Sequence, residues 1–312
     1  MSEALSGSVI QKGLKLEDVF FEVEHHEMLG LRRKGQLRLF HMVMHSNKFF
    51  ADDLQAVLYR NLARYVFSRA KLVDFKKNDE LESAVSQAMR VMQENGDADS
   101  EGTGNALSEI LIYAFLEEML HAPKIMSRVE LYTELSQFKS ECKGIHLLSP
   151  EDGDGELRYQ LVFGASHIVG VLQDANDNAF DTIMKIEKRE NREIVMVQKT
   201  AMDRMVEGEQ AKRLKEIIIP DPGQSTSYDT AYGVFLGYSL GLKTEDRGEE
   251  FETLAKQKME YDIKYYAPYI AKKIKDNGLN NHSFYFYVVP FNDAEQDKHE
   301  IMDNVLKGGV IV

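Results

Sequence analysis

The stretch RYQLVFGASHIVG, residues 158–170, is apolar until it reaches a glycine and then becomes polar. Continuous apolar runs of this length are typical of strands that are covered on both faces of a sheet. After the glycine come Ala165, Ser166 and His167. Because side chains alternate along a strand, Ala165 and His167 point to one face and Ser166 to the other. The polar end of this strand is the best candidate for a reaction centre.

A neighbouring internal strand is predicted by KGIHLL, residues 143–148. The polar sequence SPEDGDGE between the two strands favours a hairpin connection. His146 is a secondary candidate for the site, although alternation turns it away from Lys143 unless Gly144 carries a bulge. Enclosure of His146 by apolar groups, with a hydrogen bond to backbone, would end that candidacy.

A buried helix is predicted by GNALSEILIYAFLEEMLHAPK, residues 104–124, which is apolar nearly all round and ends near Pro123. Glu109 shares a helical stripe with Tyr113 and Leu116, so its carboxylate should be withdrawn from water. Burying an unpaired carboxylate is costly. We therefore expect Glu109 to face a metal, a base or a hydrogen-bond donor, and a structural salt bridge is the alternative.

The composition indicates a globular protein of 312 residues, 43% apolar, which forms one large domain or two closely joined ones. We place a boundary in the turn-rich run NGDADSEGTGN, which separates an N-terminal α/β subdomain, residues 1–95, from residues 96–312. In the first third, residues 15–26 and 35–45 alternate as strands do, and residues 51–75 have helical spacing. No signal peptide or apolar span stands out, so we expect a cytoplasmic protein without a membrane partner.

The formal net charge of −13 argues against unaided nucleic-acid binding, because Lys and Arg supply most of the affinity for phosphates. Three basic clusters, at residues 185–193, 211–215 and 271–275, could form a local patch. Each cluster is interleaved with acidic or apolar residues, which favours solvated faces of helices or hairpins. Cys142 is the only cysteine, and we expect a small buried hydrophobe there in preference to a nucleophile.

The strand pair has the spacing that nucleases of the broad PD-(D/E)XK class use. In that class an acid on one strand and Glu-x-Lys on the next hold a divalent metal, with a cation beside the attacked phosphate. Here Ala165 stands at the Glu position and His167 at the Lys position. Only half of the constellation is present.

The region from residue 104 to about residue 238 resembles the HamA subunit of the bacterial Hachiman antiphage defence system. The resemblance rests on LSEILIYAFLEEMLHAPKIMSRVEL, KGIHLL, LVFGASHIVGVLQDANDNAFDTI and TAYGVFLGYSL, and it spans close to half of the chain. It implies an α/β fold of the PD-(D/E)XK nuclease type, with a mixed central sheet flanked by helices and an N-terminal α/β extension. It also implies a HamB-like superfamily 2 helicase as partner in a heterodimer, and DNA degradation when infection or DNA damage is sensed.

Three positions depart from the pattern expected of active relatives. Where DGIH is expected this chain has Lys143 in place of the acid, and where GESK is expected it has Ala165 and His167. Glu109 alone matches its expected acid. Two lost carboxylates should weaken Mg²⁺ binding, since that ion is held through carboxylates and phosphate oxygens.

Two hypotheses remain, and we prefer the first because a defence complex needs an effector. In it, the chain is a divalent-metal DNase, with Mg²⁺ as the expected metal. Glu109 and Asp174 bind the metal, and His167 acts as general acid or base or as a ligand. The residues assigned to catalysis are Glu109, Lys143, Ser166 and His167. A replacement acid would come from Glu130, Glu141, Asp174 or Asp177, the last two lying about one helical turn apart.

In the second hypothesis the chain is a non-catalytic module that binds DNA or clamps the helicase, and His167 is a hydrogen-bonded histidine at a strand end. A retained site predicts that His167 and Glu109 converge on one small polar cavity, provided that the Glu109 helix packs on the His167 face. The apolar strand SFYFYVVPF and the ending VLKGGVIV offer surface for the helicase, or form a core strand and a buried tail.

Overall fold

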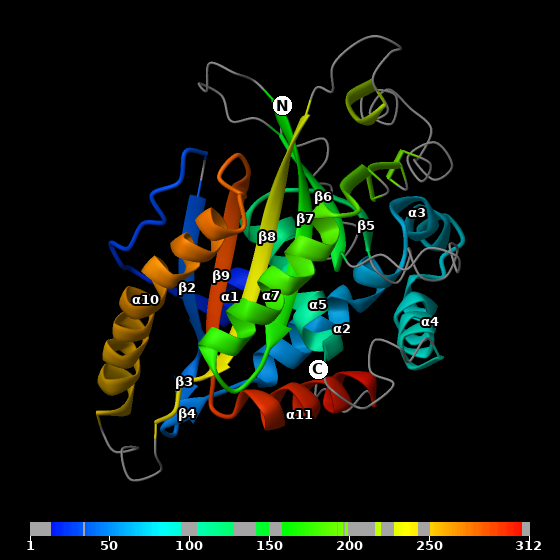
Figure 1. Ribbon diagram of the computed structural model, residues 1–312. Helices are drawn as coiled ribbons and strands as arrows, with labels where there is room; N and C mark the ends of the chain where they lie inside the picture. Colours follow the sequence, from blue (N-terminus) through cyan, green and yellow to red (C-terminus); the bar gives the residue numbers. More distant parts are fainter. Residues whose placement is uncertain are drawn as a thin grey trace.

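A mixed seven-stranded sheet forms the centre of the computed structural model, in the order β1-β2-β9-β8-β7-β6-β5 (Figure 1). The structure describes residues 14–33, 35–94, 105–127, 142–149, 158–191, 193–195, 197–198, 216–219, 228–242 and 250–307. The strands of the sheet are β1 (Phe20–Val23), β2 (Gly35–Met42), β5 (Lys124–Ser127), β6 (Gly144–Leu148), β7 (Tyr159–Ile168), β8 (Tyr228–Ser239) and β9 (Ser283–Phe291). A separate two-stranded ribbon consists of β3 (Met44–His45) and β4 (Lys48–Phe49).

Four neighbouring strands, β2, β9, β8 and β7, run parallel, and β1, β6 and β5 are antiparallel to their neighbours. Parallel neighbours need crossover connections, which place helices on the faces of a sheet. The predicted mixed central sheet flanked by helices is confirmed. Both β7 and β9 are buried along nearly their whole length, as their apolar sequences predict. Residues 283–291 are therefore a core strand, and residues 308–312 of the tail lie outside the described part.

The two faces of the sheet are covered by different helices (Figure 1). Helices α7 and α10 lie over one face, while α5 and the π-helical segment η2 that continues it lie over the other. Phe180 of α7 stacks on Phe286, and Phe115 of η2 packs on Phe235. The helices are α1 (Leu16–Val19), α2 (Asp52–Val66), α3 (Arg69–Lys77), α4 (Leu81–Glu94), α5 (Asn105–Ala114), η2 (Phe115–Met119), α7 (Leu172–Glu187), α10 (Phe251–Asp276) and α11 (Ala294–Leu306).

Most of the elements expected from periodicity are present. The buried helix over residues 104–124 corresponds to α5 and η2, and residues 51–75 form α2 and α3. The break between α2 and α3 falls at Ser68, whose hydroxyl accepts a hydrogen bond from the Lys71 amide and caps α3. The strand expected from residue 15 onward is wrong at its start. There the Asp18 carboxylate accepts from the Lys15 amide at 2.7 Å, which favours the short helix α1 before β1.

The N-terminal part of the chain contributes directly to the central sheet. β1 and β2 join it beside β9, and apolar residues from Leu16 to Val305 form one continuous core. The expected boundary near residue 95 and the expected hairpin connection at residues 149–156 fall almost wholly outside the described residues. Among the helices that the structure describes, none has the length and apolar character needed to cross a membrane.

Candidate functional site around Glu109, Lys143 and His167

Glu109 is a buried carboxylate on α5, with a relative exposure of 0%. The Lys143 ammonium donates to Glu109 Oε1 at 2.9 Å, and the Tyr65 hydroxyl donates to Oε2 at 3.1 Å. Lys143 reaches Glu109 because its own amide donates to the Gly164 carbonyl at 2.9 Å, which fixes it between the start of β6 and β7. Both carboxylate oxygens therefore accept from protein donors, and the expected salt bridge and the expected donor are both present.

Ser166 and Ala165 are fully enclosed in the core. Ser166 points toward α5 and donates to the Ser108 hydroxyl at 3.1 Å. Its exposure is 1%, so this hydroxyl pair satisfies two polar groups inside the core. Ala165 is also buried and has no side-chain atom that could bind a metal. The structure thus places Ser166 in a packing role on the α5 face.

His167 points to the opposite face of β7, toward α7. Its Nε2 lies 3.1 Å from the Thr182 hydroxyl, and that hydroxyl donates its hydrogen to the Asn178 carbonyl. A threonine hydroxyl has a single hydrogen to donate. Nε2 of His167 is therefore the donor in the contact with Thr182. Nδ1 is left as the nitrogen that could accept a proton.

The surroundings of His167 lower its pKa to about 4, so the ring is neutral at physiological pH. Burial is the largest cause, and the Lys143 charge is the next. The Glu109 charge opposes the shift, while Lys185 and Lys298 add to it. Three lysines thus add to the effect of burial on the pKa of His167, and two of them are paired with carboxylates, Lys143 with Glu109 and Lys298 with Glu295.

The convergence of His167 and Glu109 on one cavity required that α5 pack on the His167 face of β7, and the structure does not meet this condition. Helix α5 packs on the Ser166 face of β7, where Ser108 contacts Ser166, whereas His167 contacts α7 through Thr182. The cause is the strand alternation itself, because successive residues point to opposite faces. Lys143 connects the two groups, since it binds Glu109 and also lowers the pKa of His167.

The acids proposed as replacement ligands lie elsewhere or outside the described residues. Asp174 is exposed in the first turn of α7, where its charge contributes to a raised pKa of Tyr266 on α10. Asp177 accepts from the Tyr269 hydroxyl at 2.6 Å and pairs with Lys273 at 2.8 Å, both on α10. These contacts direct Asp177 toward α10. Residues 130 and 141 fall in the part that is not described.

His146 and Cys142 are structural residues. His146 is fully buried, its Nδ1 lies 2.8 Å from the Ala122 carbonyl, and its ring lies near that of Tyr113. Burial lowers the pKa of His146 to about 4, so the catalytic candidacy of this residue ends. Burial also raises the pKa of the Cys142 thiol, which donates to the Gly144 carbonyl. The expectation of a small buried residue at Cys142 is confirmed.

The residues at this site do not fit Mg²⁺. That ion needs carboxylate and other oxygen ligands in octahedral geometry. Glu109 is engaged by Lys143 and Tyr65, and Ala165 offers no ligand. Within the part of the chain that the structure describes, no group of three or more His, Cys, Asp or Glu could hold a metal ion. A lysine ammonium neutralises the one acid that matches the nuclease pattern.

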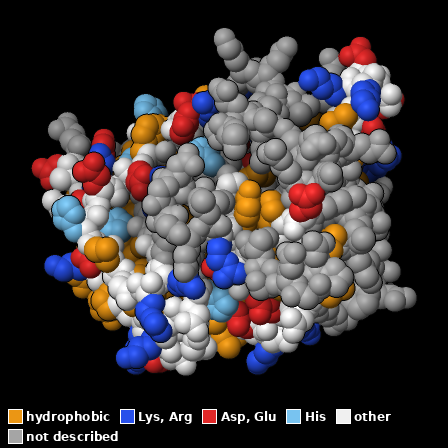
Figure 2. Space-filling view, turned by 90° about the horizontal axis from the view of Figure 1, so that it is seen from above, with side chains coloured by type: hydrophobic (Ala, Val, Ile, Leu, Met, Phe, Trp, Pro, Cys, Tyr) orange, Lys and Arg blue, Asp and Glu red, His pale blue; other side chains and the backbone are white. Residues whose placement is uncertain are grey.

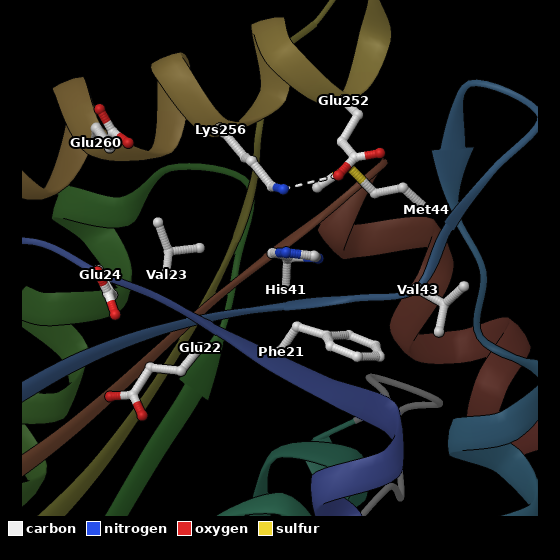
Figure 3. Close-up of a pocket in the computed structure, with 10 residues that line it drawn as sticks. All are labelled: Phe21, Glu22, Val23, Glu24, His41, Val43, Met44, Glu252, Lys256 and Glu260. Atoms are coloured by element: carbon white, nitrogen blue, oxygen red, sulfur yellow. Dashed lines mark hydrogen bonds and ion pairs between the residues drawn. The ribbon is translucent and has the colours of Figure 1, made fainter.

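A separate cavity of about 500 Å³ lies near the opposite edge of the sheet, between α10 and the strands β1 and β2 (Figure 3). His41 points into it, and the Lys256 ammonium pairs with Glu252 across its α10 wall at 2.7 Å. The remaining charged lining residues are carboxylates, namely Glu22, Glu24 and Glu260. This acidic lining is unsuited to a nucleic-acid backbone.

A model of the HamA family matches residues 18–305 of the chain. The chain therefore belongs to the HamA family, and the resemblance to that family is confirmed. Family membership implies a component of the Hachiman defence system. No curated protein matches the chain, and no solved structure matches it either.

Three contacts at the site were missed by sequence reasoning. Tyr65 reaches Glu109 from α2, Ser108 pairs with Ser166, and Thr182 fixes the ring of His167. The periodicity of residues 51–75 predicted the helix that carries Tyr65. Nothing in that periodicity indicates that the hydroxyl lies against a carboxylate 44 positions further along the chain.

Proposed function

We propose that this chain is a Hachiman component that binds its helicase partner and DNA without hydrolysing DNA at the Glu109 site. One observation supports the proposal most directly, namely that the Lys143 ammonium lies 2.9 Å from Glu109. Metal-assisted hydrolysis needs a cation held by several oxygen ligands, with open positions for water and phosphate. Here a covalently attached cation neutralises the acid.

A lysine at this position is not equivalent to a bound metal. An ammonium contributes one positive charge and three donors, and it neither lowers the pKa of a bound water nor offers open coordination positions. The Glu109 side chain is 1% exposed and that of Lys143 is 14% exposed, so the pair is shielded from solvent. Removing Lys143 from Glu109 would leave a buried charge, and this opposes transient opening of the pair.

A metal-dependent DNase with a shifted site is the second candidate, and one observation favours it. His167 is neutral, its Nδ1 could accept a proton, and lysine charges surround it. A neutral imidazole can accept a proton from an attacking water, and its pKa of about 4 makes His167 a weak general base at neutral pH. In this alternative the acid that completes the site comes from a part of the chain outside the described residues.

The partner proposed for the chain is a HamB-like helicase in a stable heterodimer. Family membership supports a partner within the Hachiman system. The net charge of −13 makes tight DNA binding by the isolated chain unfavourable, and a basic translocase would supply the missing phosphate contacts. We expect the two proteins to co-purify at moderate salt. Separate elution would exclude a stable heterodimer.

The decisive assay follows loss of plasmid DNA by the purified complex with ATP and with Mg²⁺ or Mn²⁺. We expect the parent to leave the DNA intact. A combined Lys143→Asp, Ala165→Glu and His167→Lys variant restores the expected nuclease pattern, and we expect it to gain metal-dependent cleavage. Metal-dependent cleavage by the parent would overturn the proposal. The DNase candidate additionally requires that Glu109→Ala and His167→Ala each slow cleavage by about a hundredfold.

A further inference from the structure

The C-terminal half of α10 has a composition that is unusual for this acidic chain. Residues 263–275, IKYYAPYIAKKIK, contain four lysines, three tyrosines and no carboxylate. Asp262 directly precedes this run and Asp276 directly follows it. Residues 271–275 of this run are one of the three basic clusters in the sequence, which indicate either a local basic patch or a solvated helix face. The structure shows which of its side chains face solvent.

One exposed stripe runs along this half of the helix. At 100° per residue, its members fall within about a quarter to a third of the helix circumference. Tyr261 and Tyr265 are 65% and 63% exposed, although most large apolar or aromatic side chains of the chain are buried. The stripe consists of Tyr261, Lys264, Tyr265, Pro268, Lys272 and Lys275, all of which are exposed.

The two exposed tyrosines present parallel aromatic faces. Their ring centroids lie 6.5 Å apart, with an angle of 13° between the ring planes. A third ring, that of Tyr266, meets Tyr265 edge-on with the centroids 5.0 Å apart. The Lys258 ammonium lies 5.9 Å from the centroid of the Tyr261 ring. The rings are thus supported by the helix and by their neighbours, while much of their surface remains open.

The end of α7 extends the positive charge beside the stripe. Asp177 of α7 contacts Tyr269 and Lys273 of α10, so the two helices lie side by side. In Figure 1 both helices run upward from their first residue to their last, so their C-terminal ends lie on the same side of the molecule. Lys185, Lys188 and Arg189 are exposed where α7 ends. Lys and Arg side chains, with some Asp and Glu among them, lie in the lower part of Figure 2, which is the side on which α7 and α10 cover the sheet in Figure 1.

We propose that the α10 stripe, together with the basic end of α7, binds single-stranded nucleic acid. Proteins that bind single strands without sequence preference combine aromatic platforms for the bases with positive charge for the backbone. From Tyr261 to Lys275 the stripe is about 21 Å long, which accommodates a few nucleotides. The tyrosines stack on unpaired bases, and Lys264, Lys272 and Lys275 contact phosphates. This surface is distinct from the Glu109 site, and the inference holds whether or not that site cleaves DNA.

The charge pattern favours nucleic acid over a protein partner. Lysine is depleted at protein interfaces, whereas a run of lysines without carboxylates is complementary to phosphates. Two of the neighbouring lysines, Lys258 and Lys273, are paired with Asp262 and Asp177, but the stripe lysines lie on the solvent side of the helix. The acidic cavity beside the other half of α10 provides an internal comparison, because it has exposed aromatic surface at Phe21 while Lys256 in its lining is paired with Glu252.

The test measures fluorescence anisotropy of a labelled oligothymidine of about 20 nucleotides with the full-length chain at about 50 mM salt. We expect the double variant Tyr261→Ala and Tyr265→Ala to bind about tenfold more weakly or worse, because stacking contributes roughly 1–3 kcal/mol per base. Lys272→Gln with Lys275→Gln should reduce both the affinity and its dependence on salt. Phe21→Ala, at an aromatic residue beside the acidic cavity, serves as the matched control and should bind like the parent.

Three results would overturn the proposal. The first is equal affinity of the tyrosine double variant and the parent. The second is absence of binding by the parent at that salt concentration, or tighter binding to a duplex of the same length. In the third, the double variant keeps its oligothymidine affinity but no longer co-purifies with the helicase, which would identify the stripe as a protein interface. Retained thermal stability of each variant shows that the helix itself is intact.

Discussion

The Glu109 site and the α10 stripe use lysine in opposite ways. Lys143 is largely buried and donates to a carboxylate, so its charge is neutralised inside the protein. Lys264, Lys272 and Lys275 are exposed along a helix face whose sequence lacks carboxylates from residue 263 to 275. The first arrangement closes a site to external ions, and the second leaves charge available to an external anion. The environment of a lysine therefore determines its role.

The largest expected effect comes from breaking the buried pair. Lys143→Ala leaves the Glu109 carboxylate in the core without its ammonium partner, and loss of one member of a buried pair typically costs about 3–5 kcal/mol. We expect a decrease of that size in the free energy of unfolding, measured by urea denaturation. Lys272→Ala on the stripe is the matched control and should change stability by less than about 0.5 kcal/mol.

Removing both charges distinguishes the effect of the unpaired Glu109 charge from other effects of replacing Lys143. The double variant Glu109→Gln and Lys143→Met eliminates the buried charge together with its partner, so it should recover most of the lost stability. If Lys143→Ala is as stable as the parent, the ion pair has no structural role. The contrast between a buried, paired lysine and the exposed lysines of the stripe would then not hold.

The fold was largely predictable because its strongest signals are local. The apolar runs at residues 143–148 and 158–170 became β6 and β7, and helical spacing found α2, α3 and α5. The start of the chain was mispredicted because a side-chain hydrogen bond of Asp18 overrides alternation. The place of β1 and β2 beside β9 depends on pairing between distant segments. Periodicity contains no information on such pairing.

The candidate site was predictable only in part. Alternation correctly separated Ser166 from His167, and helical spacing correctly placed Glu109 in the core. Which helix covers which face could not be read from one sequence, and for this reason the assumed approach of α5 to the His167 face is wrong. The departure at Lys143 indicated a lost ligand. The contact of the Lys143 ammonium with Glu109 could not be predicted from the sequence, because it depends on the backbone geometry at the start of β6.

An intermediate effect is expected from pH, because the buried His146 and the partly buried His167 both have a pKa of about 4 in the folded protein. The unfolded value is about 6.5, so below that pH the unfolded chain takes up protons before the folded one. Stability should be fully present above pH 6.5 and should fall progressively as the pH decreases toward 4. Each histidine contributes up to about 3 kcal/mol of that loss.

Substitution of each histidine in turn measures how much of the stability lost at low pH that histidine causes. For His146, Nδ1 is bonded to the Ala122 carbonyl, and Nε2 is buried without a hydrogen-bond partner in the described part of the chain. Protonation of Nε2 would thus add a buried unpaired donor. We expect His146→Gln and His167→Gln each to flatten the decrease in melting temperature between pH 7 and pH 4.5. Parallel curves for parent and variants would show that groups other than His146 and His167 cause the acid transition.

The smallest expected effect compares one buried tyrosine with one exposed tyrosine. Tyr65 donates to Glu109 at 3.1 Å and is fully buried, whereas Tyr261 is 65% exposed on the stripe. Tyr65→Phe removes a hydroxyl that donates to a charged acceptor, and such hydrogen bonds contribute about 1.5–3 kcal/mol. We expect the loss to lie near the lower limit, because Lys143 still neutralises the carboxylate. Tyr261→Phe should leave stability unchanged and, because the ring remains, should also leave oligothymidine binding nearly unchanged. Equal losses of stability in the two variants would show that the Tyr65 hydroxyl does not support the Glu109 site.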